Sequence, residues 1–418
     1  MESNNQGGPG RSRPRRLLLC LDGVPHKLIE KAKTRGLFAN FRGPSHLLSP
    51  FPTMTNVALS AMFAASPPAG YESLYFDRSA GELRGGIRKY LGRRTPDKIP
   101  SSYMDDLDYQ EPLAFEFLIY VAPDRVWQAD MRRFHERFRL APQTQDYFAF
   151  LKGTDGLLHA QGPERLAIAL ESLDRILRDI EEWCGDETEI VLFSDHGMNL
   201  EENQRINLLT QLRAQGITVL NKLGGTEKRA VSVPAFGLCS YAAGYCSRAE
   251  DIETVAEALT EVNGVDFVVL RDQASVVLKS SRGTARIDQC VQEGNVSYRY
   301  QCKEGDPLKL SSVSDLAAKG EFDSDSSWFE RTKSHTYPDA MANIYNSLFA
   351  KRVKHTADIL ISLSDGYYYG WSPFGRFVRL AATHGNAMRA SSNAFLMSTH
   401  REFPDYVRAD DARNFLKE

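Results

Sequence analysis

The sequence has no apolar run long enough to span a membrane, and it has little excess of charge of either sign. The apolar stretch Leu17–Leu21 is too short for the core of a signal peptide and runs directly into Asp22. The 51 Lys and Arg residues nearly balance the 54 Asp and Glu residues, which leaves a formal net charge of −3. We therefore expect a cytoplasmic protein with neither a membrane nor a nucleic acid as its partner.

Cysteine is also scarce, and the spacing of the cysteines excludes two kinds of cysteine-based site. The six cysteines are scattered along 418 residues without a CxxC pair, so they predict neither a disulfide framework nor a zinc–thiolate site. Reduced thiols are the expectation inside a cell. A disulfide between Cys290 and Cys302 across a hairpin is the less favoured alternative.

The length and the ordinary composition predict a globular protein with a large core. Residues 1–15 are polar and rich in Gly, Pro and Arg, which predicts a disordered basic tail that is solvated rather than bound to an anionic partner. Residues 16–418 are expected to form a single α/β domain. Two insertions are expected in it, a lid at about 78–145 and an antiparallel cap at about 270–335.

The stretch from Ile190 to Ser194 is a short apolar run, which predicts a strand buried on both faces of a parallel sheet. It ends on Asp195 and His196, two residue types that ligate metals, and then on Gly197. Open α/β sheets bind ligands outside the carboxyl ends of their strands. The competing interpretation is a turn in which Asp195 caps the next helix and Gly197 supplies a positive φ.

Two other predicted strands end in a similar way. One begins at Arg16 and runs into Asp22, while the other ends at Leu151, just before Asp155 and His159. The last two residues are four apart, so both can face one ion. Asp22 alone would be explained equally well by a turn that starts the following helix. Repeated on several strands, the pattern predicts carboxylates that converge on one edge of the sheet.

A hydroxyl and a third imidazole complete the set. Thr55 or Asn56 lies where a helix predicted from Val57 to Ala65 would have its N-cap, and capping alone would explain either residue. In the functional interpretation, the Thr55 hydroxyl stands at a helix N-terminus, where backbone N–H groups favour a phosphate. His384 lies in a late loop next to a glycine.

Three carboxylates and three imidazoles are enough ligands for two divalent ions. Two ions about 4 Å apart would hold both the attacking and the leaving oxygen of an in-line phosphoryl displacement. A hydroxyl bound to one of them would lose its proton near neutral pH, which makes a threonine nucleophilic. The residues therefore predict a two-metal enzyme for a small phosphorylated substrate, with Zn²⁺ expected and Mn²⁺ or Fe as alternatives.

Five segments in this order resemble the alkaline phosphatase superfamily, and most closely its nucleotide pyrophosphatase/phosphodiesterase branch. They are residues 21–23 (LDG), 51–55 (FPTMT), 155–163 (DGLLHAQGP), 194–198 (SDHGM) and 383–385 (THG). The third segment resembles the family's Asp-x-x-x-His-x-x-Gly-Pro. The resemblance implies an alkaline-phosphatase-like α/β/α sandwich with a central, mainly parallel sheet, to which the lid and a small antiparallel hairpin cap are added.

The resemblance also implies a role for each residue of the set. The ligands would divide into two groups, one of Asp22, Thr55, Asp195 and His196 and the other of Asp155, His159 and His384. Thr55 would attack phosphorus and form a phospho-threonine intermediate, which water then hydrolyses. Thr53 and Ser60 are the nearest rival nucleophiles.

One departure from the family leaves the substrate class open. The family's diesterases usually carry an asparagine after the nucleophile helix that donates to a phosphoryl oxygen, but residues 70–77 (GYESLYFD) contain none. Asn56 is the candidate to donate instead, although packing or capping explains it equally well. A phosphodiesterase or nucleotide pyrophosphatase is the expected function. The alternatives are a phosphomonoesterase or phosphonate-cleaving hydrolase of the same superfamily, and a non-catalytic member that binds phosphorylated ligands.

Overall fold

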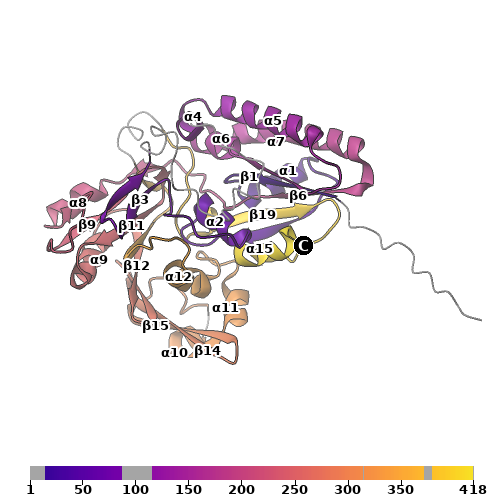
Figure 1. Cartoon of the computed structure of the whole chain (residues 1–418). Coiled ribbons are helices and arrows are strands. Elements are labelled where there is room, and N and C mark those ends of the chain that lie inside the picture. Colours follow the sequence, from indigo (N-terminus) through magenta and orange to yellow (C-terminus); the bar gives the residue numbers. More distant parts are fainter. Residues whose placement is uncertain (1–14, 87–114, 314, 371–378, 418) are drawn as a thin grey trace, which may run out of the picture.

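The computed structural model describes residues 15–86, 115–313, 315–370 and 379–417 (Figure 1). The predicted basic tail lies outside the described residues except for Arg15, which begins the first strand. Residues 87–114 of the predicted lid also lie outside them. Among the helices of the described ranges, none has the length and apolarity needed to cross a bilayer.

A six-stranded mixed sheet forms one half of the structure, with the strand order β20-β2-β19-β6-β1-β5. β1 pairs in parallel with β5 and β6, whereas β19 is antiparallel to β6 and β2. The strands are β1 (Arg15–Leu21), β2 (Arg42–Leu48), β5 (Tyr147–Leu151), β6 (Thr188–Phe193), β19 (Asn393–Ser398) and β20 (Tyr406–Arg408). The three parallel strands that were predicted from apolar runs are therefore neighbours.

Helices cover both faces of this sheet because its central strands are apolar on both sides (Figure 1). On β1, Leu17, Leu19 and Leu21 pack toward one face, and Leu18 and Cys20 pack toward the other. The first face is covered by α1 (His26–Thr34), α5 (Pro123–Leu140), α6 (Gly153–Gln161) and α7 (Pro163–Cys184). The second is covered by α2 (Thr55–Met62) and α15 (Ala409–Leu416). This arrangement confirms the predicted α/β/α sandwich.

A second sheet of nine strands is larger than the small hairpin cap that was expected, with the order β16-β15-β14-β13-β12-β17-β11-β9-β8. Its central strand β17 comes late in the chain and pairs antiparallel with β11 and β12. The strands are β8 (Thr218–Val219), β9 (Ala230–Ser232), β11 (Tyr241–Cys246), β12 (Val265–Asp272), β13 (Ser275–Ser280), β14 (Gly283–Gln292), β15 (Asn295–Gly305), β16 (Phe322–Ser324) and β17 (Ile359–Leu363).

Helices also cover the second sheet, so it has a hydrophobic core on each face. One face packs against α8 (Leu208–Ala214) and α9 (Ile252–Thr260), and the other against α11 (Asp325–Thr332) and α12 (Ala340–Phe349). In the register of β14 and β15, Cys290 lies opposite Ser297 and Cys302 opposite Ala285. The two cysteines therefore do not face each other, and both are free thiols.

The remaining elements are short. A three-stranded sheet contains β7 (Gln204–Arg205), β10 (Leu238–Cys239) and β18 (Tyr367–Gly370). A hairpin pairs β3 (Leu74–Asp77) with β4 (Glu82–Gly85). The other short elements are α4 (Phe115–Val121), η2 (Gly185–Glu187), η3 (Ala249–Asp251), α10 (Asp315–Lys319) and α14 (Arg389–Ser392). Part of the region expected to be an irregular lid is in fact α5, whose Trp127, Met131 and Phe134 are buried in the main core.

Candidate metal centre

Asp22 is the first residue after β1, and its backbone continues the hydrogen bonding of the sheet. Its N–H donates to Leu151 O at 3.1 Å, and its own carbonyl accepts a hydrogen bond from Thr154 Oγ1 at 2.7 Å. The side chain is buried and does not cap α1, whose N-cap is Pro25. The carboxylate is therefore placed by the end of the strand and is not used to start the helix.

Asp195 and His196 follow β6, next to Asp22, because β1 and β6 are paired. Asp195 Oδ1 accepts a hydrogen bond from Gly23 N at 3.1 Å. Ser194 Oγ accepts from Val24 N and donates to His196 O, both at 2.8 Å. These bonds tie the two turns together, and no helix of the described chain begins at Asp195. The helix-capping interpretation of Asp195 is therefore excluded.

The first group of candidate ligands consists of Asp22, Asp195 and His196, all buried. His196 Nε2 lies 3.3 Å from Asp195 Oδ2 and 3.5 Å from Asp22 Oδ1. Asp195 Oδ2 is buried without a hydrogen-bond partner. Since a buried carboxylate oxygen is costly to leave unpaired, this atom fits a bound cation.

The second group consists of Asp155, His159 and His384. Asp155 and His159 lie one turn apart on α6, as their spacing allowed, and His384 comes from a distant loop. Asp155 Oδ1 lies 3.2 Å from His159 Nε2 and 3.7 Å from His384 Nε2. Asp155 Oδ1 and His159 Nε2 are both buried without hydrogen-bond partners, so this group also has the donor set that a divalent ion requires.

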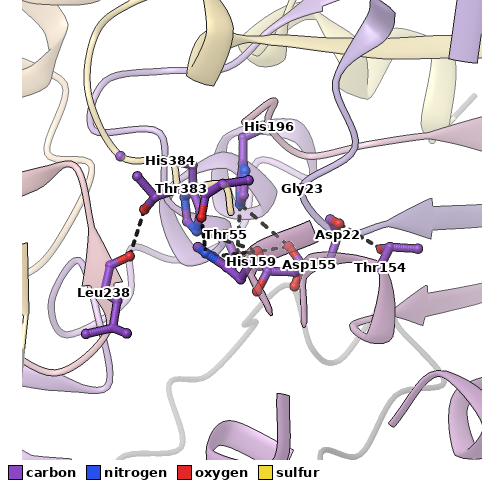
Figure 2. Close-up of polar contacts among 12 residues, drawn as sticks. Asp22, Gly23, Thr55, Thr154, Asp155, His159, His196, Leu238, Thr383 and His384 are labelled. Carbon is purple, nitrogen blue, oxygen red and sulfur yellow. Dashed lines mark hydrogen bonds and ion pairs between the residues drawn. The ribbon is translucent and has the colours of Figure 1, made fainter. Parts of the chain in front are cut away.

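The two groups are adjacent, as Figure 2 shows. The rings of His196, from the first group, and His384, from the second, are stacked with centroids 3.9 Å apart. The rings of His159 and His384 are 5.3 Å apart. All six predicted carboxylate and imidazole ligands therefore meet at one edge of the main sheet.

Backbone carbonyls orient all three histidines. The Nδ1 atoms of His159, His196 and His384 bond to the carbonyl oxygens of Ala382 at 2.8 Å, Gly197 at 2.9 Å and Thr53 at 2.8 Å. A carbonyl can only accept, so each Nδ1 carries the proton. Each Nε2 is then left with a lone pair, and all three Nε2 atoms face the carboxylates. This is the tautomer that a metal-binding histidine needs.

Burial shifts the pKa values of the residues in the first group. Burial and the neighbouring Asp195 and Asp155 raise the pKa of Asp22 well above its usual value. Burial also raises the pKa of Asp195 to about 6 and lowers the pKa of His196 to about 4. A divalent cation beside these three groups would offset the cost of charging Asp22 and Asp195, and it would bind the neutral form of His196.

Thr55 lies beside the first group and does not act as a helix cap. It is the first residue of α2, whose N-cap is Met54 with no side-chain hydrogen bond. The expectation that Thr55 or Asn56 would be the N-cap is therefore wrong. Thr55 Oγ1 donates to Asp22 Oδ1 at 3.3 Å and lies 3.3 Å from His196 Nε2. Asn56 is the next residue of α2 and is half-buried.

The two rival hydroxyls are placed differently. Thr53 is fully buried, and its hydroxyl accepts from Gly385 N at 2.8 Å and donates to Asn386 O at 3.1 Å. It therefore joins the segment before α2 to the His384 loop. Ser60 is buried inside α2, among residues that pack under the main sheet. Among the described residues, neither hydroxyl bonds to a candidate ligand.

Some residues that shape the site were missed in the sequence. Ser194 and Thr53 connect the ligand-bearing turns, but a buried serine or threonine has no spacing that marks such a role. In the competing turn interpretation, Gly197 would supply a positive φ. Instead, it is required by close packing, because a Cβ there would lie 2.4 Å from Ala390 O and 2.8 Å from Asn393 O.

We expect Gly197→Ala to lower the free energy of unfolding by about 1–3 kcal/mol, since both clashing atoms are backbone and cannot rotate away. Chemical denaturation would measure the change. Gly224→Ala is the matched control, because a Cβ there meets only the side chain of Glu227. The control should change stability by less than about 0.5 kcal/mol, and equal effects of the two variants would contradict the packing argument.

The fold and the two ligand groups together define a member of the alkaline phosphatase superfamily. A family model described as type I phosphodiesterase / nucleotide pyrophosphatase matches residues 75–369. The chain belongs to this family and is a metal-dependent hydrolase of phosphoester bonds, as predicted. The matched range contains Asp155, His159, Asp195 and His196. Asp22, Thr55 and His384 lie outside it, so only the three-dimensional structure brings them to the same site.

Solved structures with similar folds cover almost the whole chain. Phosphonoacetate hydrolase from Sinorhizobium meliloti 1021 in complex with phosphonoformate is 16% identical with a TM-score of 0.52, covering 96% of this chain and 94% of that one. Human ectonucleotide pyrophosphatase / phosphodiesterase 5 is 11% identical with a TM-score of 0.46, covering 97% and 94%. At this identity, the first likeness concerns the fold. A search of the curated proteins finds no match.

Proposed function

We propose that this phosphoryl hydrolase is a two-metal phosphodiesterase or nucleotide pyrophosphatase that acts on a small phosphate ester, with Thr55 as its nucleophile. The observation that carries the proposal is the position of Thr55 Oγ1. It lies 3.3 Å from Asp22 Oδ1 and 3.3 Å from His196 Nε2, at the centre of the first ligand group and free of any capping role.

The residues that would hold the two ions follow from the two groups. Asp22, Thr55, Asp195 and His196 would bind one ion, and Asp155, His159 and His384 would bind the other. Mixed nitrogen and carboxylate donors favour Zn²⁺, with Mn²⁺ or Fe as the alternatives. When bound, such ions supply Lewis-acid stabilisation of the phosphoryl oxygens and lower the pKa of a coordinated hydroxyl.

The chain itself would contribute the nucleophile and its orientation. Thr55 Oγ, after losing its proton to solvent, would form a bond to phosphorus while the bond from phosphorus to the leaving oxygen breaks. This gives a phospho-threonine and a leaving alcohol or phosphate that takes any proton it needs from solvent. Water would then hydrolyse this ester and restore the hydroxyl. Asn56, adjacent to Thr55 on α2, is our candidate to donate a hydrogen bond to a phosphoryl oxygen.

A turnover screen with the metal content determined would test this function. The purified chain, stripped of metal and reloaded with Zn²⁺, Mn²⁺ or Fe²⁺, should hydrolyse bis(4-nitrophenyl) phosphate or a dinucleotide faster than 4-nitrophenyl phosphate. Faster turnover of the monoester would instead favour a phosphatase, and cleavage of phosphonoacetate alone would favour a phosphonate hydrolase. A chain that holds two ions and cleaves none of these substrates would favour the non-catalytic alternative.

We also propose a cytoplasmic location, which rests on the chemistry of the cysteines. All six are free thiols, and secreted proteins more often carry their cysteines as disulfides. Fractionation of cells that express the full-length chain would test the location.

A further inference from the structure

We infer that Asp365 is a positioning residue that joins the two ligand groups into one bimetallic centre. This inference rests on the proposed two-metal function. Asp365 lies in the turn between β17 and β18, on the second half of the molecule, and is half-buried. It belongs to neither ligand group, and no sequence motif marks it.

One oxygen of Asp365 holds two buried amides. Oδ1 accepts from Asn386 Nδ2 at 2.9 Å and from Asn199 Nδ2 at 3.4 Å. Both asparagines are almost completely buried. Asn199 Nδ2 also donates to Asn203 Oδ1 at 3.3 Å. Because each buried N–H that loses its acceptor pays the cost of desolvation, the two bonds to Asp365 constrain where each asparagine can lie.

Each asparagine lies next to one ligand in the sequence. Asn386 is two residues after His384, of the second group, and Asn199 is three residues after His196, of the first. The second N–H of Asn386 donates to Leu363 O at 2.9 Å. Asp365 therefore reaches both ligand-bearing loops through one hydrogen bond each.

The two loops are also paired directly, so that a shift of one moves the other. Asn199 N donates to Thr383 O at 2.9 Å, and Thr383 N donates to Asn199 Oδ1 at 3.3 Å. Thr383 in turn donates to Leu238 O at 2.7 Å, a bond drawn in Figure 2. The amide of Asn199 thus bonds to Asp365 on one side and to the residue before His384 on the other.

The geometry predicts that the second ion depends more strongly on Asp365 than the first does. The bond to Asn386 is shorter than the bond to Asn199, and Asn386 is nearer to its histidine along the chain. Residues that orient metal ligands from the outer shell typically change metal affinity by about 10- to 100-fold. We expect a loss of that size for the Zn²⁺ held by the second group and a smaller loss for the Zn²⁺ held by the first.

Zinc titration of the metal-stripped, full-length chain, followed by calorimetry, would test this inference. Asp365→Ala removes the acceptor. It should raise the dissociation constant of the Zn²⁺ held by the second group by about 10- to 100-fold. Asp365→Asn keeps an oxygen at the same reach and should restore most of the affinity. Asp405→Ala, at an exposed position away from both ligand groups in the sequence, is the control and should bind two Zn²⁺ as the parent chain does.

The outcomes separate this inference from the proposed function. If the parent chain fails to bind two Zn²⁺, the proposed two-metal function is wrong. If the parent and Asp365→Ala bind two Zn²⁺ equally well, only the inference about Asp365 is overturned, and failure of Asp365→Asn to rescue would overturn it as well. Should Asp365→Ala not fold, Asp365→Glu keeps the charge but displaces the oxygen, and it should show the same loss of affinity.

Discussion

Thr55→Ala should abolish turnover while leaving both ions bound. The substitution removes the hydroxyl that lies 3.3 Å from both Asp22 Oδ1 and His196 Nε2, but it removes no carboxylate or imidazole. Loss of a covalent nucleophile typically lowers kcat by roughly 1,000-fold or more. Metal analysis of the purified variant should give the same two ions per chain as the parent, while the rate falls to the background.

Thr55→Ser is the matched control, because it keeps a hydroxyl at the same position and should retain measurable activity. The fold should tolerate both changes, since Thr55 is half-buried at the start of α2 and caps nothing. If Thr55→Ala kept most of the parent's activity, Thr55 would not be the nucleophile. Thr53 and Ser60 would then be the next residues to substitute.

Asp195→Asn should empty the first ion site and therefore abolish activity as well. Oδ1 of Asp195 accepts from Gly23 N, and the amide oxygen of asparagine can keep that bond. Oδ2 has no hydrogen-bond partner and would become an NH₂ group, which cannot bind a cation and would point toward His196 Nε2. Metal analysis after dialysis should give one ion per chain in place of two.

The control for Asp195→Asn is Asp179→Asn, on the exposed side of α7, which makes the same chemical change without a candidate ligand. It should bind two ions and keep the parent's rate. A variant Asp195→Asn that still holds two ions would show that Asp195 is not a ligand, whatever its activity.

The three parallel strands of the main sheet and the six candidate ligands were predictable because their signals are local. β1, β5 and β6 are short apolar runs, and each delivers its polar residue at the carboxyl end, where parallel strands share one edge. Asp155 and His159 could be paired from their spacing alone, which fits one turn of α6. His384 had only its glycine neighbour as a signal. Its position depends on contacts with Thr53 and Ser240 from other parts of the chain.

The size of the second sheet could not be predicted because its pairing is long-range. β17 has the apolar composition of a strand in either sheet, and only its pairing with β11 and β12 assigns it to the second. In contrast, α5 was missed although its signal is present. Trp127, Met131, Phe134 and Phe138 recur at helical spacing after Pro123, a residue suited to the first turn of a helix.

The carbonyl partners of the three histidines have a consequence for how this scaffold can diversify. Because the groups that select each tautomer belong to the main chain, at Ala382, Gly197 and Thr53, no exchange of those side chains can delete them. The orientation of the three imidazoles thus depends on the conformation of the backbone and not on neighbouring side chains. Side chains elsewhere around the candidate centre can therefore be exchanged without disturbing the orientation of these three imidazoles.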